Sequence, residues 1–567
     1  MGNDSGWHTL AEASGYARTA RHAETLAWAQ RLASESDLID YQVFGVSPEG
    51  RDIAILVASS DSAFTPAAAR ATGKEIVLIE AGIHPGEIEG KDAGLALLRD
   101  IAIEGKHREL LDDVIVLFIP IFNVDGHERF HPHTRINQNG PEASGWRATA
   151  QNYNLNRDFI KADAPEMRAW LNLFNAWLPD LFIDIHNTNG ADYQYDITYG
   201  LELFDNADPT LVEWQQTAFI DAIFPALEAS GHKLAPYIVL KDGTDVAKGF
   251  EVFHSEPRYS TGYTAVRNRP GLLIEMHMLK DYRTRVIGAY DVLVETLRHL
   301  NANPGRLRAA VAAADAATAA RHEDAGPYTL QLKLTDESRP YEFRGVEYTR
   351  TESDVSGGTW VQYDPGSPVT LTVPIYDSLV VDTETTTPRE YVVPAALTDV
   401  IERLDLHGIA YRRLDAAASM EVRTWRFESV EWAARPFENR HMITSFHAEP
   451  VTRTISYPAG SAVVSLAQPT ANVIMHLLEP HAPDSLLRWG FFDYVFESKE
   501  YAEPRVLERM AREMMASNPA LKAEFEQRVA DDPEFAANPR ARLYWFYERT
   551  PYFDERLNIY PVGRIER

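Results

Sequence analysis

The stretch EIVLIEAGIHPGE, residues 75–87, ends in two side chains that could bind a metal ion. Its apolar, β-branched start predicts a buried strand, and His84 and Glu87 follow directly after it. An imidazole nitrogen and a carboxylate oxygen three residues apart have a spacing at which a turn can direct both at one cation. Because His and Glu fall three apart by chance in most long chains, the pair alone does not establish a metal site.

A second histidine ends another apolar run, DLFIDIHN at residues 180–187. On a strand, Asp184 and His186 share one face of the sheet. A histidine at such a position is more often a structural residue than a ligand. Together with His84 and Glu87, however, His186 completes the two-histidine, one-carboxylate set of a catalytic zinc site, which leaves one coordination position open for water and substrate.

Glu275 lies inside the apolar run LLIEMHM, residues 272–278. A carboxylate in an apolar strand costs free energy unless it is paired or functional. One interpretation is a buried salt bridge with a nearby arginine. The other is a general base with a raised pKa, which takes a proton from the activated water.

Arginine and asparagine residues gather in GWRATAQNYNLNRDF, residues 145–159. Arg147 and Arg157 could recognise a carboxylate with two parallel hydrogen bonds, and Asn156 adds amide donors. A metal site, a carboxylate base and such a clamp together indicate hydrolysis of an amide next to a free carboxylate.

Strand-like runs alternate with helix-like runs from about residue 38 to residue 300. This order predicts an α/β fold with a mixed, largely parallel twisted sheet flanked by helices. We expect strands at 51–59, 75–82, 114–123, 180–187 and 270–278, and helices at 88–104, 164–176, 209–229 and 283–300. Functional groups gather at the carboxyl ends of strands in such sheets, where His84, His186 and Glu275 fall.

The chain of 567 residues is too long for one ordinary hydrophobic core. We expect four parts. They are an N-terminal helical segment at 1–37, a catalytic domain at 38–303, an Ala-rich helical connector at 304–326, and a C-terminal accessory region at 327–567 that is β-rich first and then α/β to helical.

The composition narrows the choice of partners and ligands. Acidic residues outnumber basic ones by 83 − 55 = 28, so we expect neither nucleic acid nor a membrane surface as a partner. The absence of cysteine leaves His, Asp and Glu as metal ligands. The first 22 residues lack the pattern of a secretory signal. A chain whose signal had been removed would look the same, and we favour a periplasmic or secreted location over a cytoplasmic one. The oligomeric state stays open.

Six segments resemble, in the same order, the motifs of the zinc carboxypeptidase family M14. They are GVSPEGRDIAIL, GIHPGE, PIFNVDG, NLNRDF, DIHN and LLIEMH, and they span about residues 38–300. The resemblance implies a carboxypeptidase-like fold, one zinc ion per chain and substrates that are the C-termini of peptides or proteins. The region after residue 327 resembles the C-terminal extensions of some bacterial members.

The resemblance also implies a role for each matching residue. His84, Glu87 and His186 would bind zinc, and Glu275 would be the general base. Arg147 would polarise the scissile carbonyl and stabilise the oxyanion. Asn156 and Arg157 would hold the terminal carboxylate of the substrate. The family also places a mobile tyrosine over the substrate. Tyr259 and Tyr263 are both candidates for it, and we favour Tyr259.

Three positions depart from the family pattern. Asn154 stands where an aspartate is usual, so an amide oxygen would support His84 and make it a weaker donor. Gly86 stands between the first two ligands in place of the arginine of digestive-type members, which predicts that a substrate contact is absent there. Val124 replaces a proline.

We expect a zinc-dependent exopeptidase that hydrolyses the C-terminal peptide bond. A zinc amidase acting on peptidoglycan stem peptides or acyl-amino acids would use the same chemistry and is one alternative. A catalytically silent peptide-binding protein is another. A serine hydrolase is disfavoured, because the chain has no Gly-x-Ser-x-Gly segment.

Overall fold

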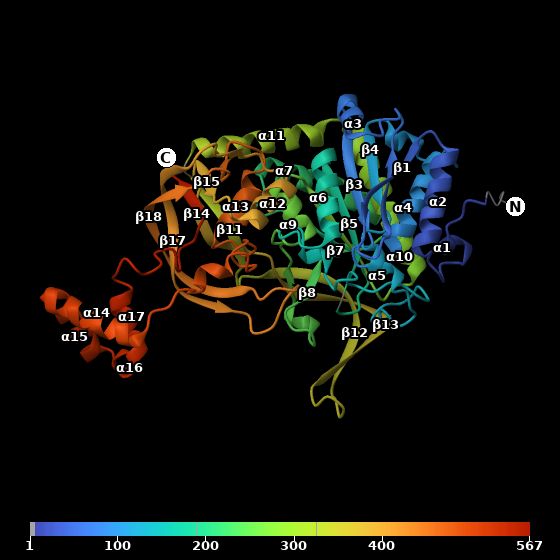
Figure 1. Cartoon of the computed structure of the whole chain (residues 1–567). Helices are drawn as coiled ribbons and strands as arrows, with labels where there is room; N and C mark the ends of the chain where they lie inside the picture. Colours follow the sequence, from blue (N-terminus) through green and yellow to red (C-terminus); the bar gives the residue numbers. More distant parts are fainter. Residues whose placement is uncertain (1–5, 189, 325) are drawn as a thin grey trace.

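The computed structural model describes residues 6–188, 190–324 and 326–567, and Figure 1 shows the whole chain. Residues 1–5 of the expected N-terminal segment and residue 325 of the expected connector lie outside the described residues. The predicted α/β architecture is confirmed: a mixed eight-stranded sheet with helices on both faces occupies the N-terminal part.

The strands at the middle of this sheet are parallel. In the order β4-β3-β5-β10 each strand runs parallel to its neighbour, whereas β1, β2 and β6 join by antiparallel pairing. The bounds are β1 (Ile39–Val46), β2 (Asp52–Ala58), β3 (Glu75–Ala81), β4 (Val114–Ile119), β5 (Leu181–Asn187), β6 (Ile197–Gly200), β7 (Leu234–Pro236) and β10 (Gly271–Met276). The carboxyl ends of β3, β5 and β10 therefore meet at one edge.

Both faces of the sheet are buried, which explains why its strands are apolar throughout. On β3, Ile76 and Leu78 pack on the side of α6 (Pro165–Trp177). Val77 and Ile79 pack on the other side, with α4 (Glu89–Ala102) and α10 (Tyr282–Ala302). Successive side chains of a strand point to opposite faces, so a strand covered on both sides has no polar alternation.

The five predicted strands and the four predicted helical regions are confirmed within a few residues. The region 209–229 contains α7 (Pro209–Gln215), a π-helical stretch (Gln216–Ile223) and α8 (Phe224–Ala229). The edge strand β1 was not expected, and neither were the short strands β6 to β9, in which three or four residues show no readable periodicity. Of these, β8 spans Ile238–Leu240 and β9 spans Phe250–Val252.

The C-terminal region, residues 327–567, follows the helix α11 (Arg306–Ala320) and contains the predicted antiparallel strands. Its first part has β11 (Pro327–Leu334), β12 (Arg339–Glu352), β13 (Thr359–Tyr376) and β14 (Leu379–Thr386). A six-stranded sheet follows, in the order β16-β19-β15-β20-β17-β18. Its bounds are β15 (Glu390–Val393), β16 (Arg412–Arg413), β17 (Ala418–Trp432), β18 (Ile443–Tyr457), β19 (Ala462–Ser465) and β20 (Gly563–Ile565).

Two helices of the C-terminal region, α12 (Thr398–Leu406) and α13 (Ala471–Leu478), belong to the same apolar cluster as α6. Leu404 and Ile474 are buried in this cluster together with Trp170 and Phe174. The helices α14 (Pro504–Ser517), α15 (Pro519–Asp531), α16 (Pro533–Ala537) and α17 (Pro539–Tyr547) instead stand apart from the body, at the lower left of Figure 1. Within the described residues, no helix is long and apolar enough to cross a membrane.

Candidate active site

The predicted ligands come from the ends of two neighbouring strands. His84 and Glu87 lie in the turn between β3 and α4, where the amide of Glu87 donates to the carbonyl of His84 at 2.8 Å. His186 lies near the end of β5, and Glu275 is its register partner on β10. All four side chains are buried. The order of the parallel strands thus brings residues from three distant segments to one place.

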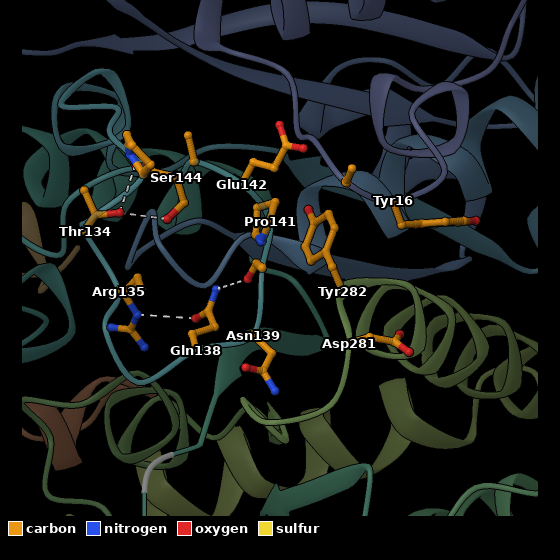
Figure 2. A pocket seen from close by; sticks show the side chains of 14 residues that line it. Tyr16, Thr134, Arg135, Gln138, Asn139, Pro141, Glu142, Ser144, Asp281 and Tyr282 are labelled. Carbon is orange, nitrogen blue, oxygen red and sulfur yellow. Dashed lines mark hydrogen bonds between the residues drawn. The ribbon is translucent and has the colours of Figure 1, made fainter.

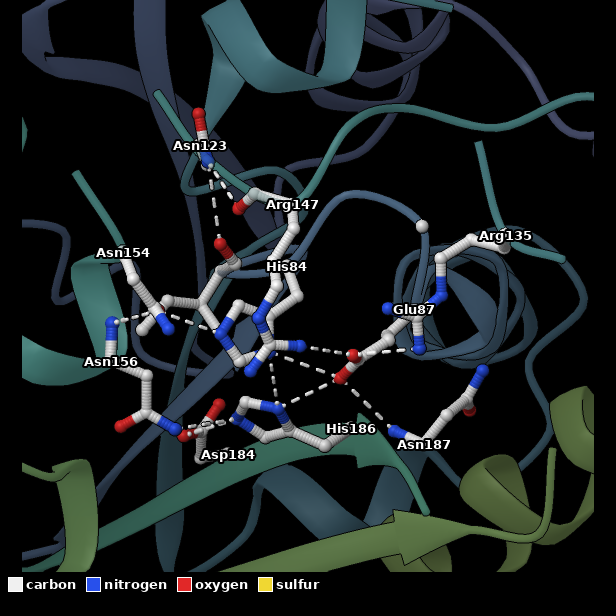
Figure 3. Close-up of polar contacts among 12 residues, drawn as sticks. His84, Glu87, Asn123, Arg135, Arg147, Asn154, Asn156, Asp184, His186 and Asn187 are labelled. Atoms are coloured by element: carbon white, nitrogen blue, oxygen red, sulfur yellow. Dashed lines mark hydrogen bonds and ion pairs between the residues drawn. The ribbon is translucent and has the colours of Figure 1, made fainter. Parts of the chain in front are cut away.

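Three atoms that could bind one metal ion converge at this place (Figure 3). The Nδ1 atoms of His84 and His186 lie 3.1 Å apart, and Glu87 Oε2 is 3.1 Å from the first and 3.0 Å from the second. In the part of the chain that the structure describes, this is the only cluster of three such residues that could hold a metal ion.

The opposite nitrogen of each imidazole is held by a side-chain oxygen. His84 Nε2 donates to Asn154 Oδ1 at 2.9 Å, and His186 Nε2 donates to Asp184 Oδ2 at 2.7 Å. These bonds place the proton on Nε2 of both rings and leave the Nδ1 lone pairs for a ligand. Asp184 precedes His186 by two residues, so its support of the imidazole follows from the shared strand face.

The electrostatics of the cluster favour a cation. Burial lowers the pKa of His84 to about 4, so this imidazole is neutral near pH 7. Burial opposes a charge on His186. The carboxylates of Asp184, Glu87 and Glu275 nevertheless raise the pKa of this histidine well above its usual value. Burial also opposes a charge on Glu87, but His84 and Arg135 hold its pKa well below the usual range. The carboxylates thus draw a positive charge to the cluster, and a divalent ion such as zinc would take the place of the proton on His186 Nδ1.

Glu275 lies beside the cluster without a salt-bridge partner among the described residues. The residue is 7% exposed, and its Oε2 is buried without a hydrogen-bond partner in the described part of the chain. Burial raises the pKa of Glu275 well above the usual value, which keeps the carboxyl ready to accept and return a proton. Of the two interpretations given above, the salt bridge with an arginine is wrong.

Two arginines hold the second oxygen of Glu87. Arg147 Nη1 lies 3.0 Å from Glu87 Oε1, and Arg135 Nη2 lies 2.9 Å from the same atom. The stem of Arg135 crosses directly over Gly86, since a Cβ at Gly86 would lie 2.5 Å from its Cγ and Cδ. An arginine from a distant loop thus lies beside the position where the sequence has no arginine. No local pattern around Arg135 could have indicated this contact.

The predicted clamp lies on the other side of the cluster. Asn154, Asn156 and Arg157 belong to one turn, in which Asn154 Oδ1 also accepts from the amide of Asn156 at 3.1 Å. The guanidinium carbon of Arg157 lies 4.2 Å from the ring centre of Tyr259. The amide of Ser260, at the start of α9 (Ser260–Val266), donates to Asn156 Oδ1. Tyr259 therefore lies next to Arg157.

The structure separates the two candidate tyrosines. Tyr263 is fully buried, and its hydroxyl contacts His407 Nδ1 at 2.8 Å. Its place in the core is not one from which a side chain could cover a substrate. A third tyrosine was missed: Tyr237, between β7 and β8, lies within electrostatic reach of Glu275 and Glu87, and the charge of Glu275 raises its pKa. The sequence between 187 and 275 carries no motif that indicates this position.

Figure 2 shows the lining of a cavity of about 510 Å³. It is connected to the cluster through Arg135, which lines the cavity and forms an ion pair with Glu87. Arg135 and Gln138 form one of its walls, and Gln138 Nε2 also donates to the carbonyl of Gly86 at 2.9 Å. Tyr16, Glu142 and Tyr282 lie across from them. In Figure 3, Asn154 and Asn156 of the clamp lie on one side of the metal cluster, and Arg135, which lines the cavity, lies on the other.

A parallel sheet edge that carries two histidines, a glutamate ligand and a separate buried glutamate is typical of metal-dependent hydrolases. The comparison with known proteins agrees with this class. A model of the zinc carboxypeptidase family matches residues 25–223 of the chain. Two fungal proteins, carboxypeptidase 2 of Trichophyton rubrum and of Trichophyton tonsurans, are each 26% identical over 479 residues, which is 81% of this chain and 82% of each relative.

Among solved structures, a metallo-carboxypeptidase from Burkholderia cenocepacia aligns with a TM-score of 0.37 and 20% identity over 50% of this chain and 68% of that chain. The family match over residues 25–223 and the two curated relatives agree with the resemblance that the six motifs indicated. The chain is thus a metallocarboxypeptidase, an enzyme of the hydrolase class.

Proposed function

We propose that the protein removes single residues from the C-termini of peptides or proteins, with one zinc ion held by His84, Glu87 and His186. The observation that carries the proposal is the convergence of three buried metal-binding atoms beside Glu275. The turn with Asn156 and Arg157, which could bind a carboxylate, lies next to them. When bound, zinc supplies a Lewis acid that polarises a carbonyl and lowers the pKa of a water molecule.

Glu275 acts as the general base and then as the general acid. Its carboxylate takes a proton from the attacking water and passes that proton to the nitrogen of the leaving residue, so the amide bond breaks without forming an amide anion. A raised pKa suits this role, because the same group must hold the proton between the two steps.

Arg147 stabilises the negative charge that develops on the carbonyl oxygen of the scissile bond. Its side chain is 40% exposed and reaches the cluster through Glu87, so it can contact both the site and a bound substrate. A guanidinium that Glu87 already holds at the site stabilises such an oxyanion with little reorganisation during the reaction.

Asn156 and Arg157 bind the terminal carboxylate, and Tyr259 covers the bound residue. The stacking of Arg157 on the Tyr259 ring supports this arrangement, because the two side chains then move and bind as one surface. The peptide chain before the scissile bond would run toward Arg135 and the 510 Å³ cavity, on the side opposite the clamp.

A peptide and its C-terminal amide test this proposal. The free peptide should be hydrolysed with a kcat/KM at least about 100-fold higher than the amide, because only a carboxylate can pair with Arg157. In the variant Arg157→Gln this preference should fall to within about fivefold. Equal rates on the peptide and its amide in the native enzyme would reject the clamp.

A further inference from the structure

A turn of the C-terminal region reaches the candidate active site. Residues 433–442 connect β17 to β18, and Phe437 and Arg440 close the tip of this hairpin with two backbone hydrogen bonds of 2.9 and 3.1 Å. At the tip, the side chain of Glu438 points at the backbone of residues 154–157, which we call the clamp turn. Its Oε2 accepts the amide hydrogen of Asn154 at 3.0 Å.

Asn154 is the residue through which this contact bears on the metal cluster. Its side-chain oxygen accepts from His84 Nε2 at 2.9 Å and from the amide of Asn156 at 3.1 Å, and its carbonyl accepts from the amide of Arg157 at 3.0 Å. Every one of these bonds depends on where the backbone of Asn154 lies. Glu438 fixes that backbone from outside the turn.

The tip of the hairpin is held rigidly in a costly conformation. Glu438 and Asn439 have φ angles of 49° and 64°, in the left-handed region; asparagine tolerates this region, whereas glutamate rarely adopts it, so the strain lies at Glu438. Such strain persists only where the surroundings determine it, and it gathers at functional sites. A loop that served only to join two strands could use glycine at these positions.

The anchors of the hairpin are strong and lie on both sides of the tip. Arg440 forms two hydrogen bonds to Asp163, at 2.6 and 2.8 Å, and its guanidinium carbon lies 4.0 Å from the ring centre of Phe491. The ring of Phe437 stacks on Trp489, with 6.1 Å between the ring centres. Bidentate, partly buried pairs of this kind fix a side chain in one geometry. Glu438 is therefore presented to Asn154 by a preorganised support.

We propose that Glu438 is a positioning residue of the active site, through which the C-terminal region holds the turn 154–157 and so orients both His84 and the carboxylate clamp. The inference rests on the proposed function, because it assumes that His84 binds zinc and that Arg157 binds substrate. It gives the C-terminal region a role in metal affinity. The usual aspartate behind His84 is an asparagine here, which has no charge of its own to hold its place, and a carboxylate from the hairpin secures it.

The test compares zinc affinity in four proteins, with a chromogenic chelator as the competitor. In Glu438→Asn the side chain is one methylene too short to reach Asn154, while asparagine tolerates the left-handed backbone. We expect its dissociation constant for zinc to rise about three- to tenfold, somewhat less than is typical when the direct partner of a metal-binding histidine is removed. Glu438→Gln keeps an oxygen acceptor and should therefore keep most of the native zinc affinity. Glu428→Gln, on the exposed part of β17, removes the same charge and should change nothing.

A double-mutant cycle separates positioning from a general loss of structure. In the background Asn154→Ala, the path from Glu438 to His84 is cut, so Glu438→Asn should no longer change the zinc affinity. It should still raise KM for a free peptide, because the backbone of the clamp turn remains its target. The visible absorption of the cobalt-substituted enzyme should change in Glu438→Asn but not in Glu428→Gln, since it reports the geometry of the ligands.

The outcomes distinguish the two proposals. Suppose that the native enzyme binds zinc and releases C-terminal residues. If Glu438→Asn then has native zinc affinity, or if its effect on zinc affinity simply adds to that of Asn154→Ala, the positioning role is rejected and the proposed function stands. If the native enzyme bound no zinc, the proposed function itself would fail. Thermal unfolding of the metal-free variants shows whether the hairpin is intact. If Glu438→Asn does not fold, the double-mutant cycle is measured with Glu438→Gln instead. The effect of Glu438→Gln on zinc affinity must then be small and non-additive with that of Asn154→Ala.

Discussion

At the scale of single residues, the site consists of groups whose chemistry the sequence shows and groups that only the fold supplies. His84, Glu87, His186 and Glu275 can be found from the sequence, because each ends or interrupts an apolar strand. Arg135 and Glu438 cannot, because they lie in loops far from the motifs and reach the site through tertiary contacts. Motif reading finds residues that act on the substrate or the metal, and misses those that hold them in place.

The role of Glu275 makes the sharpest prediction at this scale. Glu275→Gln has nearly the same shape but cannot accept the proton of the attacking water, so kcat should fall by about 10²- to 10⁴-fold. Zinc content should stay native, because Glu275 is not one of the three converging donors. Turnover measured together with metal analysis checks this, and a variant with native kcat would contradict the general-base role.

The support of His84 by Asn154 leads to a second prediction. Asn154→Asp restores a carboxylate behind the imidazole, which makes the histidine a stronger donor and should tighten zinc binding by about three- to tenfold. The amide of Asn156 keeps its acceptor in this variant, so the clamp turn stays intact. Competition with a chelator measures the change. Unchanged or weaker zinc binding would show that the residue at 154 does not tune the ligand.

At the scale of secondary-structure elements, the parallel core of the sheet was predicted well and its edges poorly. The strands β3, β4, β5 and β10 are covered on both faces, and an unbroken apolar run is a strong signal for such strands. The same signal says nothing about direction, so it could not show that β2 pairs with β4 in the antiparallel sense. Nor could it find β6 and β7, whose side chains owe their place to neighbours distant in sequence.

The first turn of α6 contains a buried acid that makes stability depend on pH. Glu166 is fully buried with no hydrogen-bond partner for either carboxylate oxygen among the described residues, and burial raises its pKa from 4.5 to about 7. The folded state thus binds this proton more tightly than the unfolded state. Its contribution to stability is complete below about pH 4.5 and is lost as the pH rises through about 7.

Glu166→Gln should remove this loss, because glutamine stays neutral at every pH. The difference in free energy of unfolding between the variant and the native protein should therefore shift in favour of the variant by about 1–3 kcal/mol from about pH 5 to about pH 8. Denaturant unfolding at both pH values gives the difference. An identical difference between variant and native protein at the two pH values would show that Glu166 does not titrate in this range.

At the scale of the whole molecule, the C-terminal region is built into the enzyme and is more than an appendage. Its helices α12 and α13 share an apolar cluster with α6, and the pair of Arg403 and Arg440 on Asp163 joins the two parts beside the clamp. A change of texture near residue 327 marks a boundary in sequence, but composition does not show which buried faces meet. We propose that residues 38–303 and 327–567 fold together, apart from α14 to α17.

The helices α14 to α17 should be removable. They have a small apolar cluster of their own, which includes Phe525 and Trp545. The chain leaves and re-enters the body at neighbouring points, since the amide of Asn558 donates to the carbonyl of Val495 at 2.8 Å. Replacing residues 500–552 by a short Gly/Ser linker should keep kcat/KM and shift the thermal midpoint by no more than about 4 °C. Lost activity in a folded protein would give these helices a role in catalysis.

If a zinc ion held at the sheet edge drives the release of C-terminal residues, removing and restoring the metal should switch this release off and on. A library of unmodified peptides is incubated with the enzyme, with the enzyme plus chelator, and with the chelated enzyme plus restored zinc, and the products are followed by mass spectrometry. We expect ladders of single C-terminal losses in the first and third samples and none in the second. Cleavage at internal bonds, or ladders that persist without metal, would contradict this expectation.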